Sequence, residues 1–117
     1  MNEWTIDVNE ENFEEEVFKS EIPVLIDFWT ITCIPCKSLS VILDKFGRSM
    51  EGRLKIVKVN AEEQPGLAAQ LGVRGVPTLM LFDHGEVIEN RGGFFLLHEL
   101  RQWIESALGN TKPRKDV

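Results

Sequence analysis

The chain has only two cysteines, and the run Cys33-Ile34-Pro35-Cys36 places both where a predicted strand leads into a predicted helix. Residues 24–29 before the motif form a nearly continuous apolar run, which is typical of a strand buried on both faces of a sheet. Pro35 fits the first turn of a helix because the N–H that proline lacks has no partner there. The fold must therefore contain a central buried strand followed directly by a helix whose first turn carries both cysteines.

The position of the two thiols predicts reversible dithiol/disulfide chemistry. Unpaired backbone N–H groups and the positive end of the helix dipole favour a thiolate over a thiol at Cys33, which is the candidate nucleophile. Cys36 lies three positions further along the same helix, within reach of the first sulfur and pointing more inward. It is the candidate resolving thiol.

Two other interpretations of the motif are weaker. A zinc site normally needs a second pair of ligands, and His84 and His98 do not have the spacing that completes one, so we expect no bound metal. A purely structural disulfide would close too short a loop to remove much entropy from the unfolded chain.

Composition limits the class of protein. A chain of 117 residues is large enough for one domain, predicted over residues 1–108 with a flexible tail over 109–117. The formal net charge of −6 argues against nucleic-acid binding, which needs a basic surface. Apolar runs are too short for membrane spans and no signal-peptide pattern is present, so the default expectation is a cytoplasmic protein.

Hydrophobic periodicity predicts an α/β fold with a mixed sheet. The expected strands cover residues 4–8, 22–29, 54–59, 78–82 and 86–90, and the expected helices begin at Asn9 as N-cap and cover 33–50, 65–71 and 96–108. The early βαβα order requires parallel strands, whereas the turn at Asp83-His84-Gly85 predicts an antiparallel hairpin.

A charged residue interrupts the most apolar strand. Burial would raise the pKa of the Asp27 carboxyl toward neutrality, which makes it a candidate acceptor for the proton of Cys36. A purely structural Asp27 would need a partner, and Lys58 on the neighbouring strand is the candidate. Trp29 is expected to fill the space under the active-site loop.

Four segments, 24–29, 33–37, 75–78 and 81–85, together resemble the thioredoxin family in identity, order and spacing. The resemblance covers about residues 3–108. It implies a thioredoxin fold: a central five-stranded mixed sheet with four helices on its two faces and a cis peptide bond between Val76 and Pro77. It also implies that Asp27 and Lys58 lie together beneath the cysteines.

The activity implied by this resemblance is reduction of protein disulfides by a monomeric thioredoxin-type electron carrier. Its redox-active group is a Cys33–Cys36 disulfide, with no bound cofactor. Electrons would come from a thioredoxin reductase that uses NADPH or ferredoxin. Two alternatives stay open: a thiol oxidant or isomerase, and a binding or chaperone subunit in which the thiols are incidental.

The resemblance also implies a docking surface for an extended substrate segment, with the backbone of Val76 as its centre. Its other expected members are Ile34, Pro35, Gly75, Pro77, Gly92 and Gly93. Phe94 and Phe95 either extend this surface or belong to the core. Thr32 and Ile34 stand where the commonest family motif, WCGPC, has tryptophan and glycine, which leads to the hypothesis of a more selective member.

Overall fold

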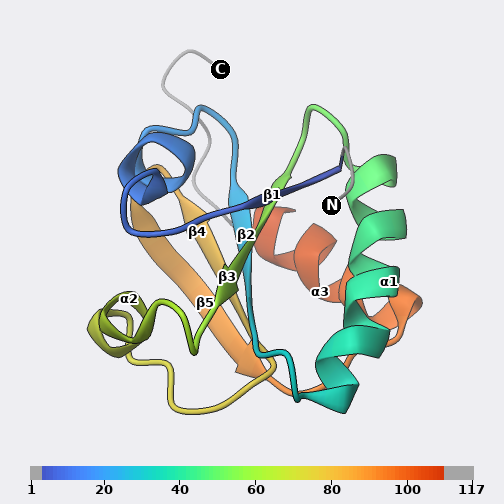
Figure 1. Ribbon diagram of the computed structural model, residues 1–117. Coiled ribbons are helices and arrows are strands. Elements are labelled where there is room, and N and C mark those ends of the chain that lie inside the picture. The colour runs from blue at the N-terminus through green and yellow to red at the C-terminus, as the bar shows by residue number, and fades with distance from the viewer. Residues whose placement is uncertain (1–3, 110–117) are drawn as a thin grey trace.

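The computed structural model describes residues 4–109, which form a five-stranded sheet between two layers of helices (Figure 1). The elements are β1 (Thr5–Asp7), η1 (Glu14–Phe18), β2 (Val24–Trp29), α1 (Ile34–Ser49), β3 (Lys55–Asn60), α2 (Pro65–Gln70), β4 (Thr78–Asp83), β5 (Glu86–Gly92) and α3 (Leu97–Gly109). The predicted tail lies outside the described residues, except for Gly109 at the end of α3.

The sheet has the strand order β1-β3-β2-β4-β5. β1, β3 and β2 run parallel, whereas β4 is antiparallel to both β2 and β5. The peptide bond between Val76 and Pro77, just before β4, is cis. These observations confirm the predicted mixed sheet with four helices, its hairpin and the cis bond.

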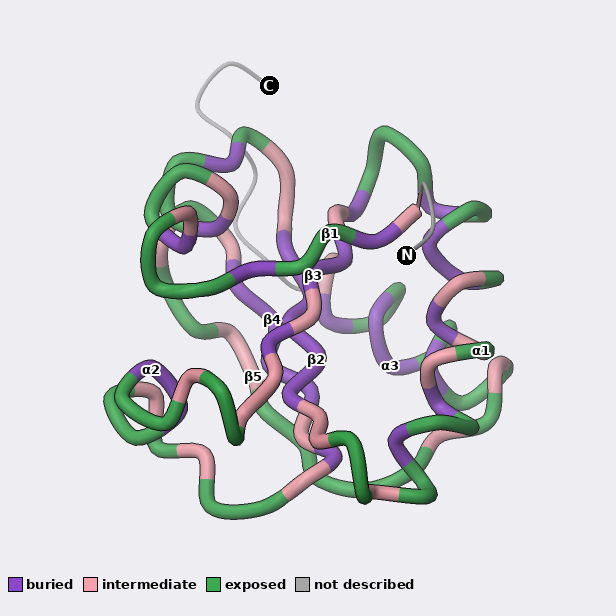
Figure 2. Tube along the Cα trace, viewed as in Figure 1, coloured by how far each residue is buried: buried purple, intermediate pink, exposed green. Residues whose placement is uncertain are grey.

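Strand alternation divides the core into two halves. On one face Leu25, Ile56 and Leu79 pack with α1 and α3, and on the other face Val24, Val57 and Met80 pack with η1 and α2. Figure 2 shows buried residues along the central strands and exposed residues on the outer turns of the helices. Leu25 is two positions before Asp27, so Asp27 also lies on the α1 face.

The side chain of Asn9 caps the turn before the first helix and not the helix itself, whose N-cap is Phe13 without a side-chain cap. The side-chain oxygen of Asn9 accepts the N–H groups of Glu11 and Asn12 at 2.8 and 3.1 Å. The chain then passes through a turn before the helix begins. Asn9 therefore satisfies two N–H groups of the turn that leads into the helix.

The helix that follows is not the expected α-helix, because its body η1 is a π-helix. The N–H of Lys19 donates to the carbonyl of Glu14, five residues earlier, at 2.9 Å. This spacing aligns Phe13 with Phe18, whose rings meet edge to face at 5.2 Å. Both rings also meet Phe82 of β4 edge to face, at 6.2 and 5.8 Å. The aromatic packing on the sheet accounts for the wider helical turn.

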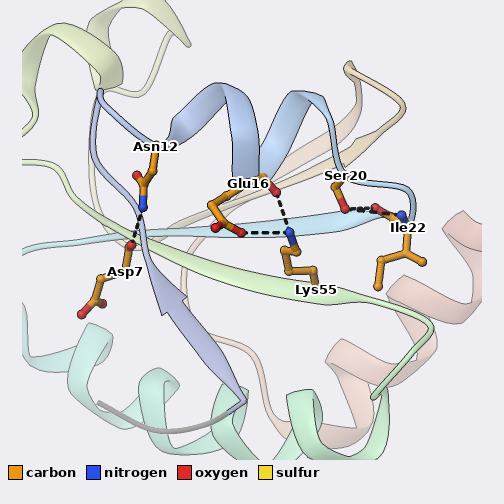
Figure 3. Close-up of polar contacts among 6 residues, drawn as sticks. All are labelled: Asp7, Asn12, Glu16, Ser20, Ile22 and Lys55. Carbon is orange, nitrogen blue, oxygen red and sulfur yellow. Dashed lines mark hydrogen bonds and ion pairs between the residues drawn. The ribbon is translucent and has the colours of Figure 1, made fainter.

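Polar contacts attach this N-terminal segment to the sheet (Figure 3). Lys55 Nζ, at the start of β3, contacts both the carboxylate and the backbone carbonyl of Glu16 at 3.0 Å. Asn12 Nδ2 donates to the carbonyl of Asp7 at 3.2 Å. The first contact attaches η1 to β3, and the second attaches the segment before η1 to the end of the edge strand β1, which forms one wall of the site described below.

Candidate active site

The two cysteines lie at the start of α1 and are joined by a disulfide. Cys33 is the N-cap residue, with extended backbone, and its sulfur accepts the N–H of Cys36 at 3.2 Å. Cys33 is half-buried, whereas Cys36 is only 3% exposed. The geometry therefore leaves Cys33 accessible and covers Cys36, as the predicted roles of nucleophile and resolving thiol require.

Three charged residues form one row across the sheet under this helix. In the strand register Lys58 of β3 lies between Asp7 of β1 and Asp27 of β2. Side chains on neighbouring strands at the same register point to the same face, so the row faces α1. The sequence places two carboxyls and one amine beneath the cysteine helix in this way.

A cavity of about 450 Å³ separates the row from α1. The helix contributes Cys36, Ser40 and Asp44 to its wall, at intervals of four residues along one helix face. The remaining lining residues are Thr5, Asp7, Asp27, Trp29, Thr30, Ile31, Lys37 and Lys58. Cys36 and Asp27 thus line the same cavity.

Asp27 is a buried carboxyl without a hydrogen-bond partner. It is 1% exposed, and neither of its side-chain oxygens has a partner among the described residues. Its pKa is raised from 3.8 to about 7, chiefly by burial, with the charge of Lys58 acting to lower the pKa and the charge of Asp44 acting to raise it. A carboxyl with this pKa exchanges a proton near neutral pH, which a general base requires.

Lys58 lies beside Asp27 in the strand register, but it does not supply the partner that a purely structural Asp27 would need. The Lys58 ammonium donates to Ser40 Oγ and lies 3.6 Å from Asp44 Oδ1. The Lys58 side chain is only 14% exposed and Asp44 Oδ1 is itself buried, so this ion pair lies inside the cavity.

Sequence reasoning missed Ser40 and Asp44 as members of the site. They follow Cys36 by four and eight positions. Polar residues at this spacing on an otherwise apolar helix stripe are a signal that would have identified them.

The start of α1, the loop before β4 and the end of β5 lie at the same end of the sheet (Figure 1). Thr78 of β4 is the register partner of Phe28 of β2 on one side and of Gly92 of β5 on the other. The segments that adjoin these residues therefore lie at one end of the strands. Thr78 Oγ1 donates to the carbonyl of Gly75 at 2.7 Å, and the N–H of Gly93 donates to the carbonyl of Pro77 at 3.0 Å. The cis-proline loop is thus fixed on both sides.

The Thioredoxin family model matches residues 4–106. The chain belongs to the thioredoxin family. Its Cys33–Cys36 pair fits the redox-active disulfide of that family, and the chain is a thiol–disulfide oxidoreductase.

Thioredoxins from several bacteria are similar to this family member over most of their length. The thioredoxin of Rickettsia bellii is 38% identical over 99 residues, which cover 85% of the chain and 94% of the relative. Thioredoxin 1 of Nostoc sp. is 39% identical over 101 residues, covering 86% and 94%. The thioredoxin of Pseudomonas aeruginosa is 37% identical over 106 residues, covering 91% and 98%.

The surface around the cysteines of this thioredoxin-family chain is apolar. Ile34, inside the motif, is 73% exposed, and Ile31, in the loop before the cysteines, is 65% exposed. Pro35 is exposed as well. Sequence reasoning missed Ile31, although an apolar residue in a loop next to the motif was a visible signal.

Phe94 and Phe95 are neighbours in sequence but differ in packing. Phe95 stacks on Trp103 with ring centroids 5.6 Å apart and packs against the core, whereas Phe94 is 44% exposed. Phe95 is therefore a core residue.

Trp29 lines the cavity beside Cys36, and its buried Nε1 has no hydrogen-bond partner within residues 4–109.

Neither metal-binding clusters nor membrane helices occur in residues 4–109. No three His, Cys, Asp or Glu side chains there are grouped to hold a metal ion. No helix in this range has the length and apolar character needed to cross a bilayer.

Proposed function

We propose that this chain reduces disulfide bonds in other proteins, with Cys33 as nucleophile, Cys36 as resolving thiol and Asp27 as the acceptor of the Cys36 proton. The observation that carries the proposal is the cavity that Cys36 shares with the unpartnered carboxyl of Asp27. A buried carboxyl without a partner is costly to fold, so its presence beside a buried thiol points to a chemical role.

The first step starts from the reduced protein. The Cys33 thiolate attacks one sulfur of the substrate disulfide, and the second substrate sulfur leaves as a thiolate that takes a proton from water. A mixed disulfide now joins Cys33 to the substrate. The half-buried position of Cys33 at the helix N-terminus supports this role.

The second step resolves this intermediate. The Asp27 carboxylate takes the proton of Cys36, and the Cys36 thiolate attacks the Cys33 sulfur. The S–S bond to the substrate breaks, the remaining substrate sulfur leaves as a thiolate, and the Cys33–Cys36 disulfide closes. Two electrons have passed from the dithiol to the substrate. The structure has the disulfide of this final state.

Lys58 acts on this reaction through Asp27. Its positive charge favours the carboxylate and so lowers the pKa of Asp27 against the effect of burial. Lys58 is therefore a positioning residue in this account, since its ammonium contacts Ser40 and Asp44.

Substrates would dock on the cis-proline loop. A groove of about 400 Å³ is lined by Gly75, Val76, Pro77 and Gly92, and a substrate segment can pair there with the backbone of Val76. The exposed side chains of Ile31 and Ile34 add apolar area beside Cys33, which favours substrates with apolar residues next to the cysteine.

The dithiol must be regenerated by an external donor. A thioredoxin reductase that draws on NADPH or ferredoxin supplies the two electrons in this proposal, and the chain itself acts as a monomer without a bound cofactor. A reducing compartment such as the cytoplasm fits this role, because the dithiol must persist long enough to meet substrates.

The test is the pH dependence of the second step. Resolution of a pre-formed mixed disulfide between Cys33 and a peptide should accelerate with pH through an apparent pKa near that of Asp27. In an Asp27→Asn variant this transition should be lost and the rate at pH 7 should fall about a hundredfold, the lower end of the range for general-base catalysis. An unchanged profile in the variant would remove Asp27 from the mechanism.

A further inference from the structure

The Lys58 ammonium contacts side chains of α1 and does not bond to the carboxyl of Asp27 on the neighbouring strand. Lys58 is the register neighbour of Asp27, and its Nζ reaches across the cavity to Ser40 and Asp44 on α1. The Lys58 side chain is only 14% exposed, so its ammonium needs acceptors wherever it lies. Ser40 Oγ accepts a hydrogen bond from the ammonium on the helix wall, and Asp44 Oδ1, 3.6 Å away, is its ion-pair partner.

We propose that Ser40 and Asp44 are positioning residues that hold the Lys58 ammonium on α1, away from the Asp27 carboxyl, and thereby set the pH range in which Asp27 changes its protonation state. The importance of this anchoring for turnover rests on the proposed role of Asp27. The position of the ammonium itself does not depend on that role.

Electrostatics gives the direction of the effect. An opposite charge close to a carboxyl favours the charged form, and the interaction strengthens steeply with proximity in a poorly solvated space. An ammonium bonded directly to Asp27 would keep the carboxyl ionised at neutral pH and make it a weak base. Holding the ammonium on α1 weakens this interaction and leaves the carboxyl basic enough to take a proton from a thiol.

The other charged groups around the cavity are few. Asp7 comes from β1, Lys37 and Asp44 from α1, and Cys36 carries a titratable thiol when the protein is reduced. Asp44 acts twice in the same direction, because it attracts the ammonium and its own charge raises the pKa of Asp27. Ser40 carries no charge, so removal of its hydroxyl removes the hydrogen bond to Lys58 and leaves the charged groups around the cavity unchanged in number.

The experiment is a titration of the Asp27 carboxyl in the oxidised full-length protein by carbon NMR, with the Asp27→Asn spectrum used for assignment. In Ser40→Ala the ammonium loses an acceptor on α1 and moves toward Asp27, so the midpoint should fall by about 1 pH unit. Ser40→Thr retains a hydroxyl and should titrate like the parent. Ser38→Ala, the same change at an exposed position of α1, should also leave the midpoint unchanged.

A double-mutant cycle separates anchoring from any direct effect of Ser40. In a Lys58→Met background, Ser40→Ala should no longer shift the midpoint. The proposal is overturned if Ser40→Ala leaves Asp27 at the parental midpoint, or if the same shift persists without Lys58. If the midpoint moves but the rate of mixed-disulfide resolution keeps its pH profile, the anchoring stands and the role of Asp27 as proton acceptor fails.

Discussion

Asp27 and Lys58 are register partners on β2 and β3, yet the Lys58 ammonium contacts α1 and the Asp27 carboxyl has no hydrogen-bond partner within residues 4–109. The two side chains face the same cavity beneath Cys36. The negative charge of ionised Asp27 is therefore only partly offset by the positive charge of Lys58. This relationship has consequences for both stability and chemistry.

Stability should depend on pH through Asp27. Its pKa is about 7 in the folded protein against an ordinary value of 3.8, so between these pH values the folded state binds more protons than the unfolded state. Stability is consequently lost as pH rises through this window. Asp27→Asn removes the effect, and its advantage over the parent should grow by about 3 kcal/mol between pH 5 and pH 9. Urea unfolding at both pH values measures it, and a gap that does not change with pH contradicts the burial of an ionisable Asp27.

The order of the two thiols can be tested by trapping. Cys36→Ser should accumulate a stable mixed disulfide between Cys33 and an oxidised model peptide, because serine cannot attack the Cys33 sulfur. Mass spectrometry detects the adduct. Cys33→Ser should give less than about a tenth as much under the same conditions, since Cys36 is 3% exposed. Equal adducts in the two variants would contradict the assignment of roles.

Substrate choice should depend on the residues that replace the commonest family motif. Thr32→Trp/Ile34→Gly removes the 73% exposed isoleucine and restores a large aromatic surface beside Cys33. Across a panel of disulfide peptides, the parent should show a wider spread of kcat/KM than this variant and should prefer apolar neighbours of the cysteine. Equal kcat/KM for all peptides in the parent would contradict selectivity.

Gly47 of α1 should not tolerate a methyl group. A Cβ at this position would lie 2.9 Å from the backbone oxygen of Trp4 and 3.3 Å from Ile56 Cδ1. Gly47→Ala should destabilise the protein by about 1–2 kcal/mol, since the clash exceeds the gain in helix propensity. Gly66→Ala is the matched control, because its Cβ would meet only the end of the flexible Glu10 side chain. A Gly47→Ala variant as stable as the parent would show that β1 and α1 can separate at no cost.

Local sequence patterns were sufficient for most of the fold. The apolar run before Cys33, the proline in the first helical turn and the turn at residues 83–85 each specify an element, and their order determines the sheet. The π-helix η1 was not predictable in this way. Its spacing depends on the contact of Phe13 and Phe18 with Phe82, which lies on a distant strand.

The candidate site was also predictable only in part. Cys33, Cys36 and Asp27 could be identified because their chemistry is unusual for their local environment. The contacts of Lys58 could not, because several acceptors lie within reach of its flexible side chain and the choice among them depends on how α1 packs over β3. Only the assembled structure brings Ser40 and Asp44 into that choice.

The most direct test of the account is the midpoint potential of the Cys33–Cys36 pair, measured by equilibration in dithiol/disulfide buffers with thiol alkylation and Trp29 fluorescence as readouts. A protein that reduces the disulfides of other proteins should have a potential near that of thioredoxin, about −270 mV. A value of about −120 to −180 mV would contradict the account, because the pair would then act as an oxidant or isomerase.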